Sequence, residues 1–490
     1  MNERRAGILL HPTSLPGGDV GTLGAAAHDF ARFLARCGTS IWQILPLQPV
    51  GVGDSPYAGT SAFAGNTLLI AHPGAATEHA PAVDYDATRR RSDEHLRDAT
   101  DRILADAVER SAFEAYCQLE AEWLDDYVLF ATAREAYEGR PWTEWPAAIR
   151  DRESSAIAAF RREHAAAIAR HAVGQMLFDR QWAAVRASMH GHGVAILGDI
   201  PIFVAHDSAD VWSRRDLFLL DDAGQPTAVA GVPPDYFSPT GQLWGNPLYD
   251  WGALARTDYA WWTARLRRTL SHVDLIRLDH FRGFAAYWSI PSDAPTAESG
   301  HWVRGPGVDL FRAMERALGR SLPIVAEDLG TITPDVHALR EELGYPGMRI
   351  LQFAFGDDAR NPYLPHNHER TTAVYTGTHD NDTTVSWFAT IGEQERHRVR
   401  SYLGVDGADI AWELTRAALA SVANLAIVPM QDLLSLDASG RMNTPGRLGG
   451  NWSWRLTPDQ LNDGVADRFR DLVTLYGRRL AINNGQENPK

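Results

Sequence analysis

A dense group of polar side chains follows one short apolar run. Residues 274–284 read DLIRLDHFRGF, and the apolar part before the polar group has the length of a buried strand. Arg277 and Asp279 are two positions apart, so a strand would place both side chains on one face. The guanidinium would keep Asp279 ionised and oriented, which a carboxylate nucleophile requires. A structural ion pair that only holds a loop at the strand end is the alternative that these residues leave open.

Two further carboxylates end similar apolar runs. Glu327 follows LPIVA, and Asp380 follows TAVYTGTH. If these runs are parallel strands of one barrel, Asp279, Glu327 and Asp380 meet at its mouth, where like charges raise the pKa of at least one of them. Asp279 as nucleophile and Glu327 as proton carrier would form the pair that cleaves glycosidic bonds with retention, for which we expect the carboxyl groups about 5–5.5 Å apart.

Strands that could position these residues occur along the whole chain. Eight apolar runs end in polar, glycine or proline residues, and amphipathic helical patterns such as 25–35, 308–317, 334–343 and 409–422 lie between most of them. The runs are residues 7–11, 40–47, 194–202, 273–281, 322–329, 349–355, 372–380 and 425–434. Alternation of strands and helices predicts an α/β fold, and eight such units predict a closed (β/α)8 TIM barrel. A doubly wound open sheet is the alternative, although no Gly-x-Gly-x-x-Gly follows an early strand.

Two connections are longer than a barrel needs. We expect residues 67–193 to form a largely helical inserted subdomain between the second and third strands. Residues 203–272 would form an active-site loop region between the third and fourth strands. The chain, residues 1–490, is otherwise predicted to be a single catalytic barrel.

The second connection contains an aromatic stretch without periodicity. Residues 231–251 read GVPPDYFSPTGQLWGNPLYDW, which we interpret as an ordered active-site loop. Aromatic faces beside Asp235, Gln242 and Asn246 suit a ligand that is apolar on one face and hydroxylated at its edges, such as a sugar. An Ω-loop packed only against itself is the alternative.

Composition excludes several classes of protein. The formal net charge of −15 argues against nucleic acid or an anionic membrane as a partner. No stretch has the apolar length of a transmembrane helix or of a signal-peptide core, so we expect a cytoplasmic enzyme. His190, His192, His366 and His368 lack a zinc-site spacing and are predicted to be solvated loop histidines.

Long strings in this sequence closely resemble one enzyme family. They include HPTSLPG, WQILPLQPVGVGDSPYAGTSAFAGN, GDIPIFVAHDSADVW, AGVPPDYFSPTGQLWGNPLYDW, RLDHFRGF, AEDLG, THDND and NTPGRLGGNWSWR. Their order and content resemble the amylomaltases, the 4-α-glucanotransferases of glycoside hydrolase family 77 in the α-amylase clan. The resemblance covers almost the whole chain.

The resemblance implies roles for individual residues. Asp279 would be the nucleophile that forms a β-glucosyl-enzyme, Glu327 the general acid/base, and Asp380 the carboxylate that holds and distorts the donor sugar. The remaining implied substrate contacts are Arg277, His379, His280, Tyr57, Asp235, Gln242, Trp244, Asn246, Asn451 and Trp452. The family needs no metal or organic cofactor.

The implied reaction moves an α-1,4-glucan segment from a donor to the 4-hydroxyl of an acceptor. Maltosaccharides and starch- or glycogen-derived glucans would be substrates, glucose an acceptor, and a monomer is the expected state. Transfer and hydrolysis share one glucosyl-enzyme, so an α-1,4-glucan hydrolase on the same barrel is the alternative. A barrel that binds glucan without catalysis is a second alternative.

Overall fold

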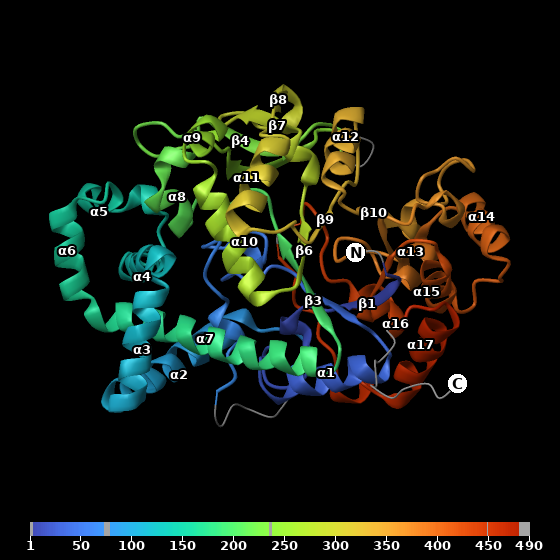
Figure 1. Cartoon of the computed structure of the whole chain (residues 1–490), viewed down its shortest axis with the longest axis horizontal. Helices are drawn as coiled ribbons and strands as arrows, with labels where there is room; N and C mark the ends of the chain where they lie inside the picture. Colours follow the sequence, from blue (N-terminus) through green and yellow to red (C-terminus); the bar gives the residue numbers. More distant parts are fainter. Residues whose placement is uncertain (1–2, 73–78, 235–237, 448, 480–490) are drawn as a thin grey trace.

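The computed structural model describes residues 3–72, 79–234, 238–447 and 449–479. Eight parallel strands form the centre of the molecule, in the order β10-β11-β12-β1-β2-β3-β6-β9 (Figure 1). Their bounds are β1 Arg5–Leu9, β2 Ile41–Gln43, β3 Ala195–Ile200, β6 Leu275–Leu278, β9 Ile324–Ala326, β10 Gly347–Ile350, β11 Thr372–Tyr375 and β12 Leu425–Pro429. Each overlaps one of the eight apolar runs in the sequence.

The sheet closes on itself between its first and last strands. The backbone N–H of Ala326 at the end of β9 donates to the carbonyl oxygen of Pro346, directly before β10, at 2.8 Å. Most strand residues are buried on both faces, which explains why the runs are almost continuously apolar. The predicted (β/α)8 barrel is therefore confirmed, and the open-sheet alternative is not supported.

Helices cover the outside of the barrel. Those with a barrel strand on each side in the sequence include α1 Ala25–Arg36, α10 Ala260–His272, α11 Val308–Leu318, α12 Pro334–Leu343, α14 Glu393–Leu403 and α15 Ile410–Ala420, and α17 Asp463–Leu475 follows the last strand. The four helices predicted from periodicity agree with the observed bounds within two residues. Gly319 and Gly344 end α11 and α12 with φ of +67° and +68°, a left-handed conformation that glycine adopts without strain.

The connection between β2 and β3 contains a group of helices at one end of the molecule. They are α2 Tyr85–Ala105, α3 Ala107–Leu119, α4 Ala121–Ala136, α5 Ala147–Arg150, α6 Ser154–Glu163 and α7 Ala165–Gly191. Figure 1 shows α7 running from this group back along the barrel toward α1. Trp123, Tyr127 and Phe130 of α4 are buried, so these side chains belong to the hydrophobic core.

A second, antiparallel sheet lies beside the barrel and was not predicted. Its order is β5-β4-β7-β8, with β4 Ala228–Val232, β5 Gln242–Pro247, β7 Ala286–Pro291 and β8 His301–Arg304. The interpretation of residues 231–251 as a loop is therefore wrong for β5. This strand lies at the sheet edge and is mostly exposed, so its sequence lacks the alternation of a half-buried strand. The short helices α8 Ala209–Ser213 and α9 Trp251–Arg256 flank this region.

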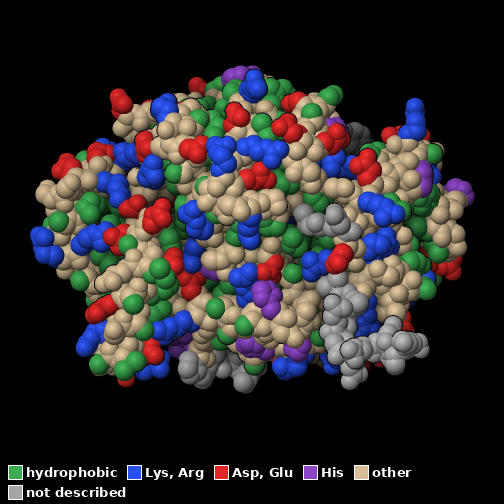
Figure 2. Space-filling view, viewed as in Figure 1, with side chains coloured by type: hydrophobic (Ala, Val, Ile, Leu, Met, Phe, Trp, Pro, Cys, Tyr) green, Lys and Arg blue, Asp and Glu red, His purple; other side chains and the backbone are tan. Residues whose placement is uncertain are grey.

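Acidic and basic side chains are interspersed over the face shown in Figure 2, rather than collected into one patch of a single sign. Among the described residues, no helix combines the length and the apolar character needed to cross a membrane.

Candidate active site

The ends of β6 and β9 are joined by backbone hydrogen bonds beyond the last strand residues. The N–H of Glu327 donates to the carbonyl of Leu278 at 3.1 Å, and the N–H of Phe281 donates to the carbonyl of Glu327 at 3.0 Å. The N–H of Asp279 donates to Ile200 at the end of β3 at 2.9 Å. These bonds fix Asp279 and Glu327 next to each other at the carboxyl end of the barrel, where TIM-barrel sites lie.

Arg277 occupies the centre of the acidic group. It is 4% exposed, and its two terminal nitrogens contact Asp279 Oδ1 at 2.8 Å and Asp199 Oδ2 at 2.7 Å. The pairing of Arg277 with Asp279 that the spacing predicted is therefore present. Asp199, which ends the third strand in the same way, was not among the predicted site residues. Burial raises the pKa of Asp199, and the charge of Arg277 opposes this shift.

Glu327 is arranged as a proton carrier. Burial, followed by the charge of Asp279, raises the pKa of Glu327 to about 8. The backbone N–H groups of His280 and Leu329 donate to its two oxygens at 2.7 and 2.9 Å and fix the plane of the carboxyl group. His280 has a φ of +49°, which is uncommon for a residue with a Cβ and orients its N–H toward Glu327.

Asp380 follows β11 in the chain and is bound by residues of the segment after β12. Asn443 Nδ2 donates to Asp380 Oδ1 at 2.6 Å, Arg441 donates to its carbonyl at 3.1 Å, and His379 Nε2 lies 3.4 Å from Oδ2. Burial lowers the pKa of His379. Asn443 was missed as a site residue, although it begins the string NTPGRLGGNWSWR.

Tyr57 connects the two halves of the site. Its hydroxyl donates to Asp199 Oδ2 at 2.8 Å, and its ring stacks on His379 with centroids 5.1 Å apart. The ring of Trp452 lies 5.9 Å from both Tyr57 and His379, and Trp452 has a φ of +62°. The structure therefore brings Tyr57, His379 and Trp452 together with the carboxylates.

The residues of β5 approach the site through one aromatic ring. Trp244 is 38% exposed, and its ring lies edge-on to His280 with centroids 4.8 Å apart. Its indole N–H donates to Gln242 at 3.0 Å, and Asn246 donates to the carbonyl of Val204 at 2.9 Å. Trp244 is thus a wall of the site, while the amides of Gln242 and Asn246 form protein contacts.

Two other predicted residues, Asn451 and His368, make hydrogen bonds within the protein. Asn451 uses its amide within its own turn, accepting from the N–H of Thr444 at 3.0 Å and donating to Arg447. Asp235 lies outside the described residues. The prediction of solvated histidines is wrong for His368, which is 8% exposed and hydrogen-bonded on both ring nitrogens.

This arrangement fits a two-step displacement on a polar substrate. An arginine holds one carboxylate, Asp279, as an acceptor, while the neighbouring Glu327 is protonated at neutral pH because its pKa is raised. A carboxylate paired with an arginine, beside a carboxyl group whose pKa is raised, fits the roles of nucleophile and general acid.

This chain is similar to known proteins over almost its whole length. The family model described as 4-alpha-glucanotransferase, glycoside hydrolase family 77, matches residues 10–461. The chain is 46% identical to a 4-alpha-glucanotransferase of Synechocystis, with 98% of this chain and 99% of the relative covered. It is 47% identical to a 4-alpha-glucanotransferase of Thermus thermophilus, with 96% and 98% covered.

A solved structure agrees with the sequence comparison. The amylomaltase from Streptococcus agalactiae, in complex with acarbose, superposes with a TM-score of 0.94 at 36% identity and covers 98% of this chain and 100% of its own. The carboxylates at the barrel mouth, the match over nearly the whole chain and the shared fold together show that this chain belongs to the 4-alpha-glucanotransferase family, glycoside hydrolase family 77.

Proposed function

We propose that the protein is a 4-α-glucanotransferase that moves α-1,4-glucan segments between maltosaccharides by a retaining double displacement. Membership of the family supports the reaction class. The single observation that carries the mechanism is the pair formed by Arg277-bound Asp279 and the partly buried Glu327, whose pKa is raised to about 8.

In the first step, Asp279 attacks the anomeric carbon of the donor sugar. The bond to the leaving 4-oxygen breaks as Glu327 gives its proton to that oxygen, so a β-glucosyl ester on Asp279 and a shortened glucan result. Arg277 orients the attacking oxygen, and the backbone N–H groups of His280 and Leu329 orient the acid.

In the second step, Glu327 takes the proton of the acceptor 4-hydroxyl, whose oxygen attacks the anomeric carbon. The new α-1,4 bond forms as the bond from that carbon to Asp279 breaks, which releases Asp279 as a carboxylate. The charge of Asp279 is one cause of the raised pKa of Glu327. Esterification removes that charge, so the pKa of Glu327 falls in the intermediate, which suits its role as base.

Other residues would bind the sugars on either side of the cleaved bond. Asp380, with His379 and Asn443 beside it, is proposed to hold the hydroxyls of the donor sugar. Trp244 and His280 would line the acceptor side, where an aromatic face stacks on the sugar ring and displaces water. Exclusion of water favours the acceptor hydroxyl over hydrolysis.

Maltosaccharides and starch- or glycogen-derived glucans are the proposed substrates, with glucose as an acceptor. The S. agalactiae amylomaltase was solved with acarbose bound, which supports this class of ligand. We retain a monomeric state and a cytoplasmic location as predictions.

Incubation of the pure protein with maltotriose tests the proposal. We expect a ladder of shorter and longer maltosaccharides while the total of reducing ends stays constant, because each transfer creates and consumes one glycosidic bond. Rising reducing ends without longer products would identify a hydrolase instead. Unchanged maltotriose with measurable binding would identify a glucan-binding barrel without catalysis.

A further inference from the structure

The segment that carries Tyr57 has no strand or α-helix of its own in which to place its backbone hydrogen bonds. We call residues 57–66, which lie after β2, the Tyr57 loop. Tyr57 at its start contacts Asp199 and His379 in the site. A loop of this kind keeps one conformation only if other groups bind its buried polar backbone atoms.

Gln175 of α7 binds the far end of the loop. Its amide accepts from the N–H of Gly65 at 2.7 Å and donates to the carbonyl of the same residue at 2.9 Å. Gln175 is fully buried, so water cannot replace this pair of bonds. A Cβ at Gly65 would lie 2.1 Å from the ring of Phe178, so the helix and the loop are in direct contact here.

Two further helices bind the middle of the loop. Asp210 of α8 accepts from the N–H of Ala62 at 2.7 Å, and Arg268 of α10 donates to the carbonyl of Phe63 at 3.1 Å. Asp210, Arg268 and Gln175 therefore bind the backbone of Ala62, Phe63 and Gly65, respectively. Side chains from three helices thus provide hydrogen-bond partners that a neighbouring strand would provide in a sheet.

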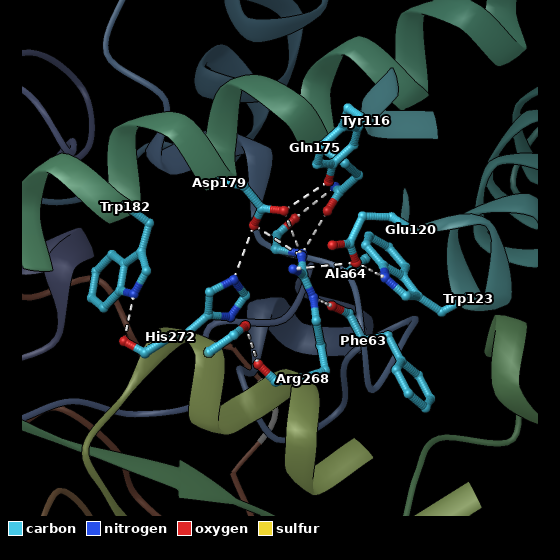
Figure 3. A network of polar contacts seen from close by, with 12 residues as sticks. Phe63, Ala64, Tyr116, Glu120, Trp123, Gln175, Asp179, Trp182, Arg268 and His272 are labelled. Carbon is cyan, nitrogen blue, oxygen red and sulfur yellow. Dashed lines mark hydrogen bonds and ion pairs between the residues drawn. The ribbon is translucent and has the colours of Figure 1, made fainter. Parts of the chain in front are cut away.

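Arg268 is itself held in a partly buried polar network (Figure 3). Both oxygens of Asp179 on α7 accept from one guanidinium nitrogen at 2.9 Å, and Asp179 also contacts His272 Nε2 at 2.9 Å. Glu120 lies 3.7 Å from Arg268, and the guanidinium lies over the ring of Trp123 at 4.5 Å. These contacts join the helices of the β2–β3 connection to α10 and fix the direction in which Arg268 points.

We propose that Gln175, Asp210 and Arg268 are positioning residues that hold Tyr57 against Asp199 and His379. The inference rests on the proposed function, because Tyr57 is proposed to bind the glucan. Loss of one of these side chains leaves buried backbone groups without partners, and the loop moves to hydrate them. A shift of about 1 Å in a binding group can cost up to about a hundredfold in rate.

Gln181 offers a matched control on the same helix. It makes the same pair of amide bonds, at 2.8 and 2.9 Å, to the N–H and carbonyl of Ala71, which lies beyond the Tyr57 loop. We expect Gln175→Leu to lower kcat/KM for maltotriose disproportionation about tenfold and Gln181→Leu less than about twofold, while both lower the Tm. Equal effects of the two variants on kcat/KM, measured well below both Tm values, would overturn the proposal.

A second readout separates positioning of Tyr57 from general loosening. If Gln175 acts through Tyr57, Gln175→Leu costs little in a Tyr57→Ala background, because the contacts of Tyr57 with Asp199 and His379 are already lost there. A full tenfold loss in that background would show that Gln175 acts elsewhere.

The wild-type protein gives a test that needs no variant to fold. We expect the backbone amides of Ala62 and Gly65 to be protected in hydrogen exchange to the level of nearby helices, since buried side chains accept from both. Exchange of these amides within seconds would contradict the proposed positioning. Absence of glucan transfer by the wild type would instead reject the proposed function. The hydrogen-exchange result would still test whether the side chains hold the Tyr57 loop.

Discussion

Two clusters of ionisable side chains, one in the candidate site and one between α7 and α10, are built from similar residues. In the candidate site, Arg277 is shared by Asp199 and Asp279, with Glu327 beside them. In the network of Figure 3, Arg268 and His272 share Asp179. The first cluster has more carboxyl groups than cationic groups, whereas the second is close to balance.

The pKa values respond in opposite directions. Burial and neighbouring carboxylates raise the pKa of Glu327 and of Asp199. Burial alone would also raise the pKa of Asp179, but the hydrogen bond from His272 and the charge of Arg268 outweigh it, and the pKa falls below its usual range. A buried cluster with unbalanced charge can exchange a proton near neutral pH, and a balanced one holds its protonation state.

The largest effect is expected from the nucleophile. Asp279→Asn should lower the rate of maltotriose disproportionation by about four to six orders of magnitude, since an amide cannot form the ester intermediate. Initial rates of maltose and glucose release give the measurement, and binding of maltosaccharides by calorimetry should persist. Near wild-type turnover would remove Asp279 from its proposed role.

Replacement of Glu327 by glutamine should lower the activity and raise the stability. Glu327→Gln should lower the rate about 10²- to 10⁴-fold. The folded-state pKa of Glu327 is raised, so the stability that its proton provides is present below the unfolded pKa and is lost as pH rises toward about 8. Gln keeps the neutral form, so the free energy of unfolding of the variant should rise by about 4 kcal/mol relative to wild type between pH 5 and pH 9.

Thermal melts of both proteins at pH 5 and pH 9 test the stability part. A Tm difference that does not grow with pH would contradict the raised pKa. The same shift predicts that kcat/KM for the donor falls as pH rises through about 8, where Glu327 loses its proton.

Asp179 should show the reverse pH dependence and a loss of stability. Asp179→Asn leaves Arg268 and His272 buried without their carboxylate, which costs about 3 kcal/mol at neutral pH. Because the pKa of Asp179 is lowered in the folded state, its ionised form contributes to the free energy of unfolding above the unfolded pKa. This contribution is lost as the pH falls through the folded pKa. Urea unfolding at pH 7 and pH 3 measures both; an unchanged midpoint at pH 7 would show that the network is not stabilising.

Tyr116 should have the smallest effect. Its hydroxyl donates to Asp179 Oδ2 at 2.7 Å, so Tyr116→Phe removes one hydrogen bond to a charged group and should cost about 1.5 kcal/mol. Glucan transfer should be unchanged, because Arg268 keeps its contacts with Asp179 and with Phe63. A fall in kcat/KM without a fall in stability would contradict this separation of the two clusters.

Several features of the fold follow from local sequence. The barrel strands are buried on both faces, so each leaves a short apolar run that ends in the polar residues of the site. The spacing of Arg277 and Asp279 predicts their ion pair, because residues two apart on a strand share a face. The second sheet could not be predicted in this way, because its edge strands β5 and β8 are mostly exposed and β5 contains glycine and proline.

Contacts that join distant parts of the chain depended on the tertiary structure. Asn443 reaches Asp380 from 63 positions away, and Gln175 reaches Gly65 from 110 positions away. Neither asparagine nor glutamine has a local pattern that marks such a partner, since its amide can bind water, side chain or backbone with equal ease.

The sequence by itself determined the eight strands, the carboxylates at their ends and the family, because each is written in neighbouring residues. The tertiary structure decided the protonation of those carboxylates. The raised pKa of Glu327 comes from burial and from Asp279, which lies 48 positions earlier in the chain and is brought beside it by the pairing of β6 with β9.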